Sequence, residues 1–142
     1  MLNYFSNAPL GISDLLYQAN SDGTNSHQIT TEDVSEIQPS FSPDGQKFAF
    51  VRSTIKYYVD SKEESDIIVK DLISGEERNL TKNLDGMVFS PAFSPSGDWV
   101  VFESFDSDLN VNIFIASIKK GVIIQVTHGN NETNPAWRSF TE

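Results

Sequence analysis

The chain has no cysteine, few basic residues and no long apolar run. Without cysteine, disulfide bonds, thiolate metal sites and a cysteine nucleophile are excluded. Lysine and arginine number 10 against 20 aspartate and glutamate residues, and a net charge of −10 repels phosphate backbones and anionic lipid. No run approaches the roughly 20 apolar residues of a membrane span, and Met1–Tyr4 lacks the basic start of a secretion signal. We therefore expect neither nucleic acid nor membrane as a partner, and a soluble protein whose compartment stays open.

What the chain does have is enough apolar sequence for one core. It holds 142 residues, of which 38% are hydrophobic and 11% aromatic. That composition is typical of a folded protein, and the length suits a single domain over residues 1–142.

The sequence repeats itself. The segment Gln38–Gly45 returns as Ser90–Gly97, a shift of 52 residues, and a shortened copy follows at Asn134–Arg138, shifted by another 44. Repeat periods in this range are typical of β-propeller blades and not of ankyrin or leucine-rich units.

Each repeat reads as four short strands, here named a, b, c and d. Strand a is Pro-x-Phe or Pro-x-Trp, and a turn such as Ser42–Gly45, with Pro and Gly at the positions that hairpins favour, leads into strand b. Strands b and c are aromatic or β-branched with little polar alternation, which predicts cover on both faces. They are expected at 47–51 and 67–69, and again at 99–102 and 113–115, while strand d closes on Leu80–Thr81 or Val126–Thr127.

Counting strands predicts an all-β propeller of three blades, in the order b-c-d, a-b-c-d, a-b-c-d, a. Known propellers begin at about four blades, so three should not close alone. We therefore expect a homodimer, in which the last strand a, with Trp137, docks beside the Leu2–Ser6 strand of the other chain and gives half of a six-bladed ring from each copy. The alternative is that the chain is a fragment of a longer propeller.

Several phrases of the sequence carry a family resemblance: FSPDGQKFAF, SDIIVKDL, NPAW and SDGTN. They resemble the repeats of TolB-type β-propellers, which have six blades. The resemblance implies a platform for proteins or peptides, and related propellers also occur as accessory domains of serine peptidases.

A longer connection between strands b and c marks the first candidate binding site. This insertion carries Lys56, Tyr57, Tyr58 and Asp60, and loops on a rigid sheet are where binding residues gather. The plainer interpretation is that the tyrosines cover an exposed blade edge. Propeller geometry puts the connections between strands d and a on the same face, which would be acidic and would favour a basic or neutral partner. These connections carry Glu32, Asp33, Asp85, His128, Asn130, Asn131 and Glu132.

A metal site is not expected. Asp106–Asn112 begins like a calcium loop, but Val111 stands where an EF-hand needs glycine and Ser117 where it needs glutamate. Asn112 also aligns with Asp14 and Asp66, which we expect to bond backbone amides at the start of strand c. The two histidines have no zinc-site spacing.

The sequence predicts no catalytic residue and no cofactor. It contains no Gly-x-Ser-x-Gly nucleophile elbow, phosphate loop or dinucleotide fingerprint. Asp44 and Ser96 are interpreted as turn formers, and Phe41, Phe93 and Trp137 as core residues because they recur at one position of the repeat. The favoured function is a noncatalytic scaffold that binds a protein or peptide; the alternative is an enzyme whose carboxylates meet at the ring centre on dimerisation.

Overall fold

The computed structural model describes residues 2–7, 14–30, 34–53, 64–106, 108–129 and 131–138, with residues 2–7 as backbone only. In these residues the chain forms eleven β-strands and no helix, so no helix there could span a membrane. The strands are β1 (Leu2–Asn7), β2 (Asp14–Ala19), β3 (His27–Gln28), β4 (Ser35–Phe41), β5 (Lys47–Ser53), β6 (Ser65–Asp71), β7 (Glu77–Asn79), β8 (Met87–Phe93), β9 (Trp99–Phe105), β10 (Val111–Ser117) and β11 (Ile123–Gln125).

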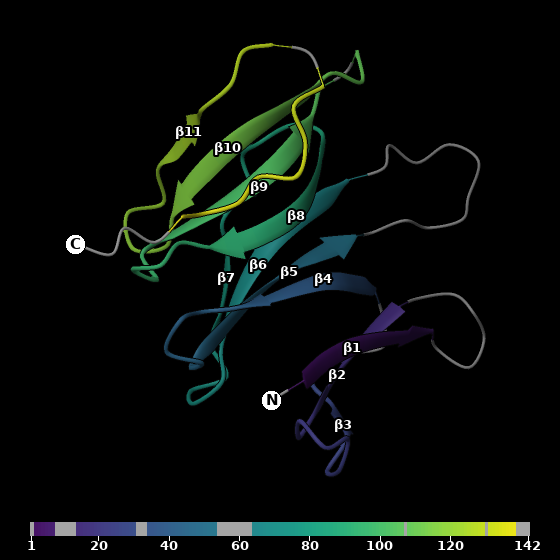
Figure 1. Cartoon of the computed structure of the whole chain (residues 1–142). Helices are drawn as coiled ribbons and strands as arrows, with labels where there is room; N and C mark the ends of the chain where they lie inside the picture. Colours follow the sequence, from purple (N-terminus) through teal and green to yellow (C-terminus); the bar gives the residue numbers. More distant parts are fainter. Residues whose placement is uncertain are drawn as a thin grey trace.

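The strands form three antiparallel sheets in chain order, β1-β2-β3, β4-β5-β6-β7 and β8-β9-β10-β11 (Figure 1). The sheets follow one another as blades, each with its first strand on one side and its short last strand on the other. The predicted order b-c-d, a-b-c-d, a-b-c-d is therefore confirmed, and the fold is an all-β propeller of three blades.

Strand a is longer than the sequence indicates, because a bulge lies inside it. β4 and β8 each hold seven residues, and their pairing with the next strand shifts by one between Ile37 and Ser40 and between Phe89 and Ala92. Gln38 and Ser90, directly before proline, both take a φ of 55°. Proline cannot donate to the ladder, and the bulge lets the strand continue past it.

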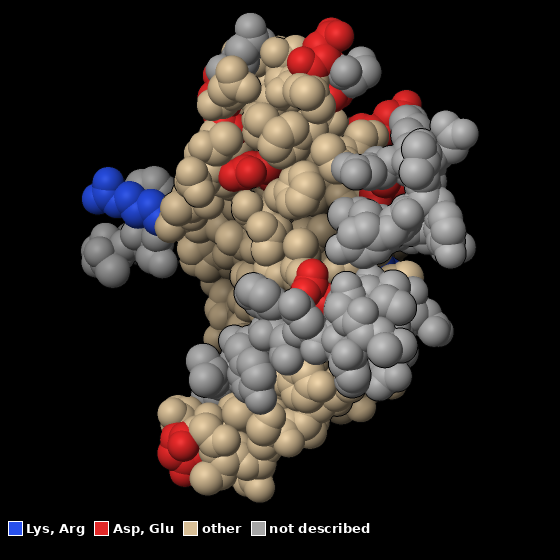
Figure 2. All heavy atoms as spheres, turned by 90° about the vertical axis from the view of Figure 1, so that its right-hand side faces the viewer, with Lys and Arg blue, Asp and Glu red and all other residues tan. Residues whose placement is uncertain are grey.

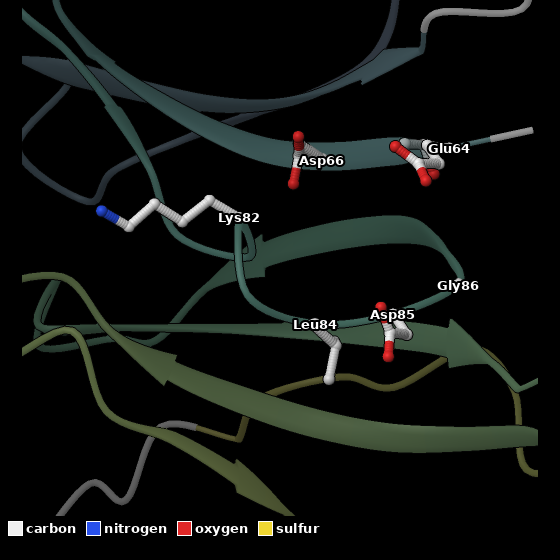
Figure 3. Close-up of a pocket in the computed structure, with 7 residues that line it drawn as sticks. Glu64, Asp66, Lys82, Leu84, Asp85 and Gly86 are labelled. Atoms are coloured by element: carbon white, nitrogen blue, oxygen red, sulfur yellow. The ribbon is translucent and has the colours of Figure 1, made fainter.

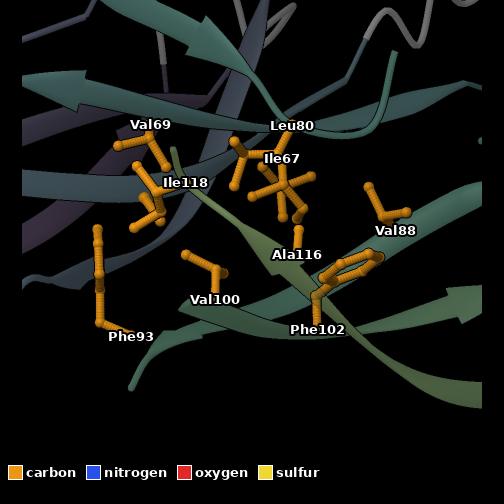
Figure 4. Packing of buried hydrophobic residues seen from close by; sticks show 11 residues of the cluster. Ile67, Val69, Leu80, Val88, Phe93, Val100, Phe102, Ala116 and Ile118 are labelled. Atoms are coloured by element: carbon orange, nitrogen blue, oxygen red, sulfur yellow. The ribbon is translucent and has the colours of Figure 1, made fainter. Parts of the chain in front are cut away.

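Two apolar clusters join the blades. The larger lies between the second and third sheets, where Ile67 and Val69 face Val100 and Phe102 (Figure 4). The smaller joins the first and second sheets through Leu16, Phe48, Phe50 and Ile68. Burial of strands b and c on both sides follows from this stacking, as their unbroken apolar runs predict.

The residues of the repeated Pro-x-aromatic position differ in burial. Phe93 is 8% exposed and Phe41 packs at the edge of the smaller cluster, but Trp137 is 38% exposed. The core prediction is thus confirmed for Phe93 and wrong for Trp137 within the single chain. The reason is that no further blade packs over Trp137 among the described residues, whereas the inner blades cover one another.

A threonine closes each blade. The hydroxyls of Thr30, Thr81 and Thr127 each accept a hydrogen bond at 2.9 Å from an amide of strand c, that of Leu16, Ile67 and Ile113 respectively. The threonine stands 14 residues after the amide each time. It satisfies a buried N–H where strand d has already ended.

This pattern corrects the expected role of Asp14, Asp66 and Asn112. Counted from the threonine bond, Leu15 and not Asp14 stands in the position of Asp66 and Asn112. The amide at the start of strand c is bonded by the threonine, and the Asp66 carboxylate accepts from the Thr81 hydroxyl at 2.9 Å. The prediction failed because Asp14 and Asp66 were aligned on residue type alone. The structure shows that the two positions differ by one residue in β2.

The hairpin turns follow their predicted chemistry. The Ser42 hydroxyl donates to Asp44 at 2.6 Å, and the Gln46 amide donates to the same carboxylate at 3.0 Å. These bonds lower the pKa of Asp44. In the second copy, the Asp98 amide donates to Ser96 at 3.3 Å, so both predicted turn formers hold their turns.

Candidate functional site

One end of the blades carries all connections from strand b to c and from strand d to a. This follows from the antiparallel order, which returns the chain to the same end after every second strand. We call this end the loop face. Figure 2 looks onto it and shows more Asp and Glu than Lys and Arg among its described atoms. The predicted residues Lys56, Tyr57, Tyr58 and Asp60 lie outside the described residues.

A hollow of about 380 Å³ opens on the loop face between the second and third blades. Its floor includes Phe105 and Phe114, and its rim carries the exposed carboxylates of Asp85 and Asp106. Its other lining residues are Asn83, Leu84, Ser104, Asn112 and Gln125. Aromatic floor and acidic rim together suit a ligand that is partly apolar and positively charged.

A second, smaller hollow of about 130 Å³ shares Leu84 and Asp85 with the first. Glu64 and Asp66 lie on its opposite side, at the start of β6 (Figure 3). Among the described residues that line the two hollows, Lys82 is the one basic residue. The two hollows form a continuous acidic groove, which follows the connection from β7 to β8.

Asn112, which lines the larger hollow, bonds the segment that carries His128. With its amide nitrogen turned towards the chain, Asn112 donates to the carbonyls of Thr127 and Gly129, both at 3.0 Å. These are the two neighbours of His128, whose ring is exposed. Asp85 lines the groove, and Asn112 holds the backbone on both sides of His128, a role that the sequence did not reveal.

Asp106 organises the turn before β10. Its carboxylate accepts from the amides of Asp108 and Asn110, each at 2.9 Å, and from the Asn110 side chain at 3.2 Å. The bonds from Asn110 lower the pKa of Asp106. No group of three or more histidine, aspartate or glutamate side chains in the described ranges could hold a metal ion.

An ion-pair network missed at the sequence level lies on the second blade, with one member on each of its strands. Glu36 is fully buried and accepts from Arg52 at 2.7 Å, and Arg52 also reaches Glu77 at 2.8 Å. The guanidinium lies over the Phe50 ring, 5.3 Å from its centre. Lys70 completes the network with a 3.2 Å bond to Glu77. The sequence did offer one signal of this network: Glu36 and Arg52 are charged residues within strands a and b of the same repeat.

A family model identifies the family, and solved structures share the fold. The family model described as the TolB β-propeller domain matches residues 8–140. TolB from Acinetobacter baumannii has a similar structure, with a TM-score of 0.71 and 22% identity over 95% of this chain and 32% of that one. A TolB-type protein from Agrobacterium tumefaciens gives a TM-score of 0.71 and 24% identity, over 89% of this chain and 42% of that one.

A peptidase is also similar in sequence. Dipeptidyl-peptidase 5 of Porphyromonas gingivalis is 33% identical over 90 residues, which are 58% of this chain and 13% of that protein. The chain thus spans less than half the length of each of these three relatives.

Proposed function

Since this chain belongs to the TolB β-propeller family, we propose that it is a noncatalytic scaffold that binds a protein or peptide on its loop face. The acidic groove between the second and third blades carries this proposal. Asp85 and Asp106 on its rim favour a basic segment, and the Phe105–Phe114 floor favours an apolar side chain next to it. Tyr57 and Tyr58 would extend the same surface.

The test is peptide selection followed by calorimetry. A displayed random peptide library is selected on the purified chain, and we expect enriched peptides to combine Lys or Arg with an aromatic residue. Asp85→Asn should weaken the selected peptide about tenfold, the usual cost of about 1.4 kcal/mol for one charge-assisted contact. Glu76→Gln, on an exposed turn at the opposite end, is the matched control and should leave affinity unchanged.

The tyrosine loop has its own variant. Tyr57→Ala with Tyr58→Ala should weaken the same peptide while the melting temperature stays within a few degrees. Equal affinities in all variants, or peptides without basic residues, would contradict the loop-face site. The kinship with a peptidase supports the enzyme alternative. Cleavage of the bound peptide, followed by mass spectrometry, would favour that alternative.

The proposed working form is a ring of two chains. The last blade leaves Val126 and Trp137 exposed, at 53% and 38%, whereas Leu80, the residue equivalent to Val126, is buried against the next blade. A further blade from a second copy would cover this side. Light scattering should give a mass near twice 15.8 kDa. A monodisperse monomer would contradict the ring and leave a segment of a longer propeller.

A further inference from the structure

The segment Asn131–Arg138, here called the tail, shares a backbone conformation with strand a but is not paired with another strand among the described residues. Asn134 precedes proline with a φ of 57°, and the equivalent residues Gln38 and Ser90 both have 55°. In β4 and β8 this residue opens the bulge. Within the described residues no ladder joins the tail to any strand. The tail therefore keeps a bulged conformation that non-glycine residues adopt only where the surroundings impose it.

Contacts with the third blade hold the tail where a next strand a belongs. The Asn134 amide donates to Glu103 at 2.6 Å, as the equivalent Ser90 amide donates to Gln38 of the preceding blade at 2.8 Å. The Trp137 indole donates to the Ala92 carbonyl of β8 at 3.0 Å. In Figure 1 the tail crosses the third sheet. We compare its position with that of the strand a that would begin a further blade.

A matching free edge exists at β1. In the second and third sheets the outer edge of strand b is filled by β4 and β8, but in the first sheet β1 is itself the edge among the described residues. The sequence from the last residue of the tail onwards is Arg138-Ser139-Phe140-Thr141, where the other copies have Ser-Pro-x-Gly. The residues that turn strand a into its own strand b are thus missing after the tail, which favours a strand b from elsewhere.

We propose that the tail pairs antiparallel with β1 of a second copy, in a register that the second blade defines. The proposal rests on the two-chain ring. Glu36 pairs with Arg52 and, past the bulge, Ser40 pairs with Ala49. The threonine bonds and strand ladders make Ser6 equivalent to Arg52. Transferring this register places Glu132 opposite Ser6 and Ala136 opposite Asn3.

Glu132 occupies a repeat position that relates the tail to the second blade. One oxygen of Glu132 is shielded from solvent and has no hydrogen-bond partner among the described residues, and the same holds for one oxygen of Glu36. Glu132 stands in the repeat position of Glu36, whose carboxylate is met by Arg52 of strand b. In the proposed pairing Ser6 takes the place of Arg52 opposite Glu132.

Disulfide trapping tests the register, because the chain has no cysteine of its own. Directly opposite residues in antiparallel strands have Cβ atoms about 4.5–5.5 Å apart, which is near disulfide reach. Mixed single variants Glu132→Cys and Ser6→Cys should cross-link into a dimer under mild oxidation. Asn7→Cys replaces Ser6→Cys in the matched control and should cross-link at least tenfold more slowly, since neighbouring positions of a β-strand fall on opposite faces of the sheet.

A second pair tests the bulge. Ala136→Cys should cross-link to Asn3→Cys, whereas a ladder without the bulge would pair it with Leu2→Cys. If the chain is a dimer but the two cysteine pairs cross-link with equal yield, or the Leu2→Cys pair with the higher yield, the register is wrong while the two-chain ring stands. A monomer without cross-links would overturn the ring and the register together. A disulfide within one Glu132→Cys/Ser6→Cys chain would overturn the second copy as the source of β1. Peptide binding is measured separately from all of these outcomes.

Discussion

Glu36 illustrates how one buried charge determines its neighbours. Its carboxylate is fully buried, and Arg52 is the basic residue that contacts it. At the equivalent positions in the third blade the chain uses Val88 and Ser104, so the fold itself does not require a charged pair there. Removing one partner of a buried pair leaves an uncompensated charge, whereas replacing both removes the problem.

Arg52→Ala should lower the free energy of unfolding by about 3–5 kcal/mol, because it strands Glu36 in the interior. The double variant Glu36→Val with Arg52→Ser copies the third blade and should recover most of that loss. Urea unfolding followed by fluorescence measures both. A double variant as unstable as Arg52→Ala would mean that packing, and not the unpaired charge, sets the cost.

Asp71 carries a pH dependence. Bonds from the backbone amides of Ser74 and Ile73, helped by Lys47, lower its pKa from 3.8 to about 2. A lowered carboxyl pKa in the folded state adds stability above the ordinary pKa, and this contribution is lost as pH falls through the folded value.

Stability should therefore fall as the pH drops from about 4 towards 2, and Asp71→Asn should flatten that fall. Urea midpoints at pH 6 and pH 3 measure the difference. Glu76→Gln, on the same turn, serves as the comparison and should keep the full pH response. If the urea midpoint of Asp71→Asn fell as much between pH 6 and pH 3 as that of the unmodified chain, Asp71 would not be the source of the pH dependence.

At the scale of the strand, local sequence determines where each element lies. The turn at Ser42–Gly45 and the apolar run of β5 place the hairpin, because proline, glycine and β-branched residues restrict the backbone locally. The bulge in β4 and β8 and the one-residue shift of β2 are different. They depend on which residue of the neighbouring strand lies opposite, and a single sequence does not reveal that register.

At the scale of the whole molecule, the last blade has all four strands, but no further blade packs on its outer side among the described residues. Trp137→Ala should weaken the proposed dimer by about 3–5 kcal/mol, the usual loss for a buried aromatic residue. In the single chain Trp137 is 38% exposed, so the melting temperature of a dilute sample should change much less. Sedimentation over a range of concentrations measures the dimer. Ile73→Ala, at a position 78% exposed, should have no effect. If Trp137→Ala lowered the melting temperature equally at every protein concentration, Trp137 would stabilise the single chain and not the dimer.

By itself, the sequence determined the blades: the repeated Pro-x-aromatic, turn and apolar segments predict their number, order and strand types, because each depends on residues close together in the chain. It also placed Asp85 and His128 on one face, since antiparallel order alone brings their connections to the same end. Only the tertiary structure decided the groove between the second and third blades, the burial of the Glu36–Arg52 pair and the place of the tail. The groove and the place of the tail depend on contacts outside the local hairpins, which no local pattern relates. Glu36 and Arg52 are opposite residues of one hairpin, but the burial of Glu36 depends on what packs over that sheet.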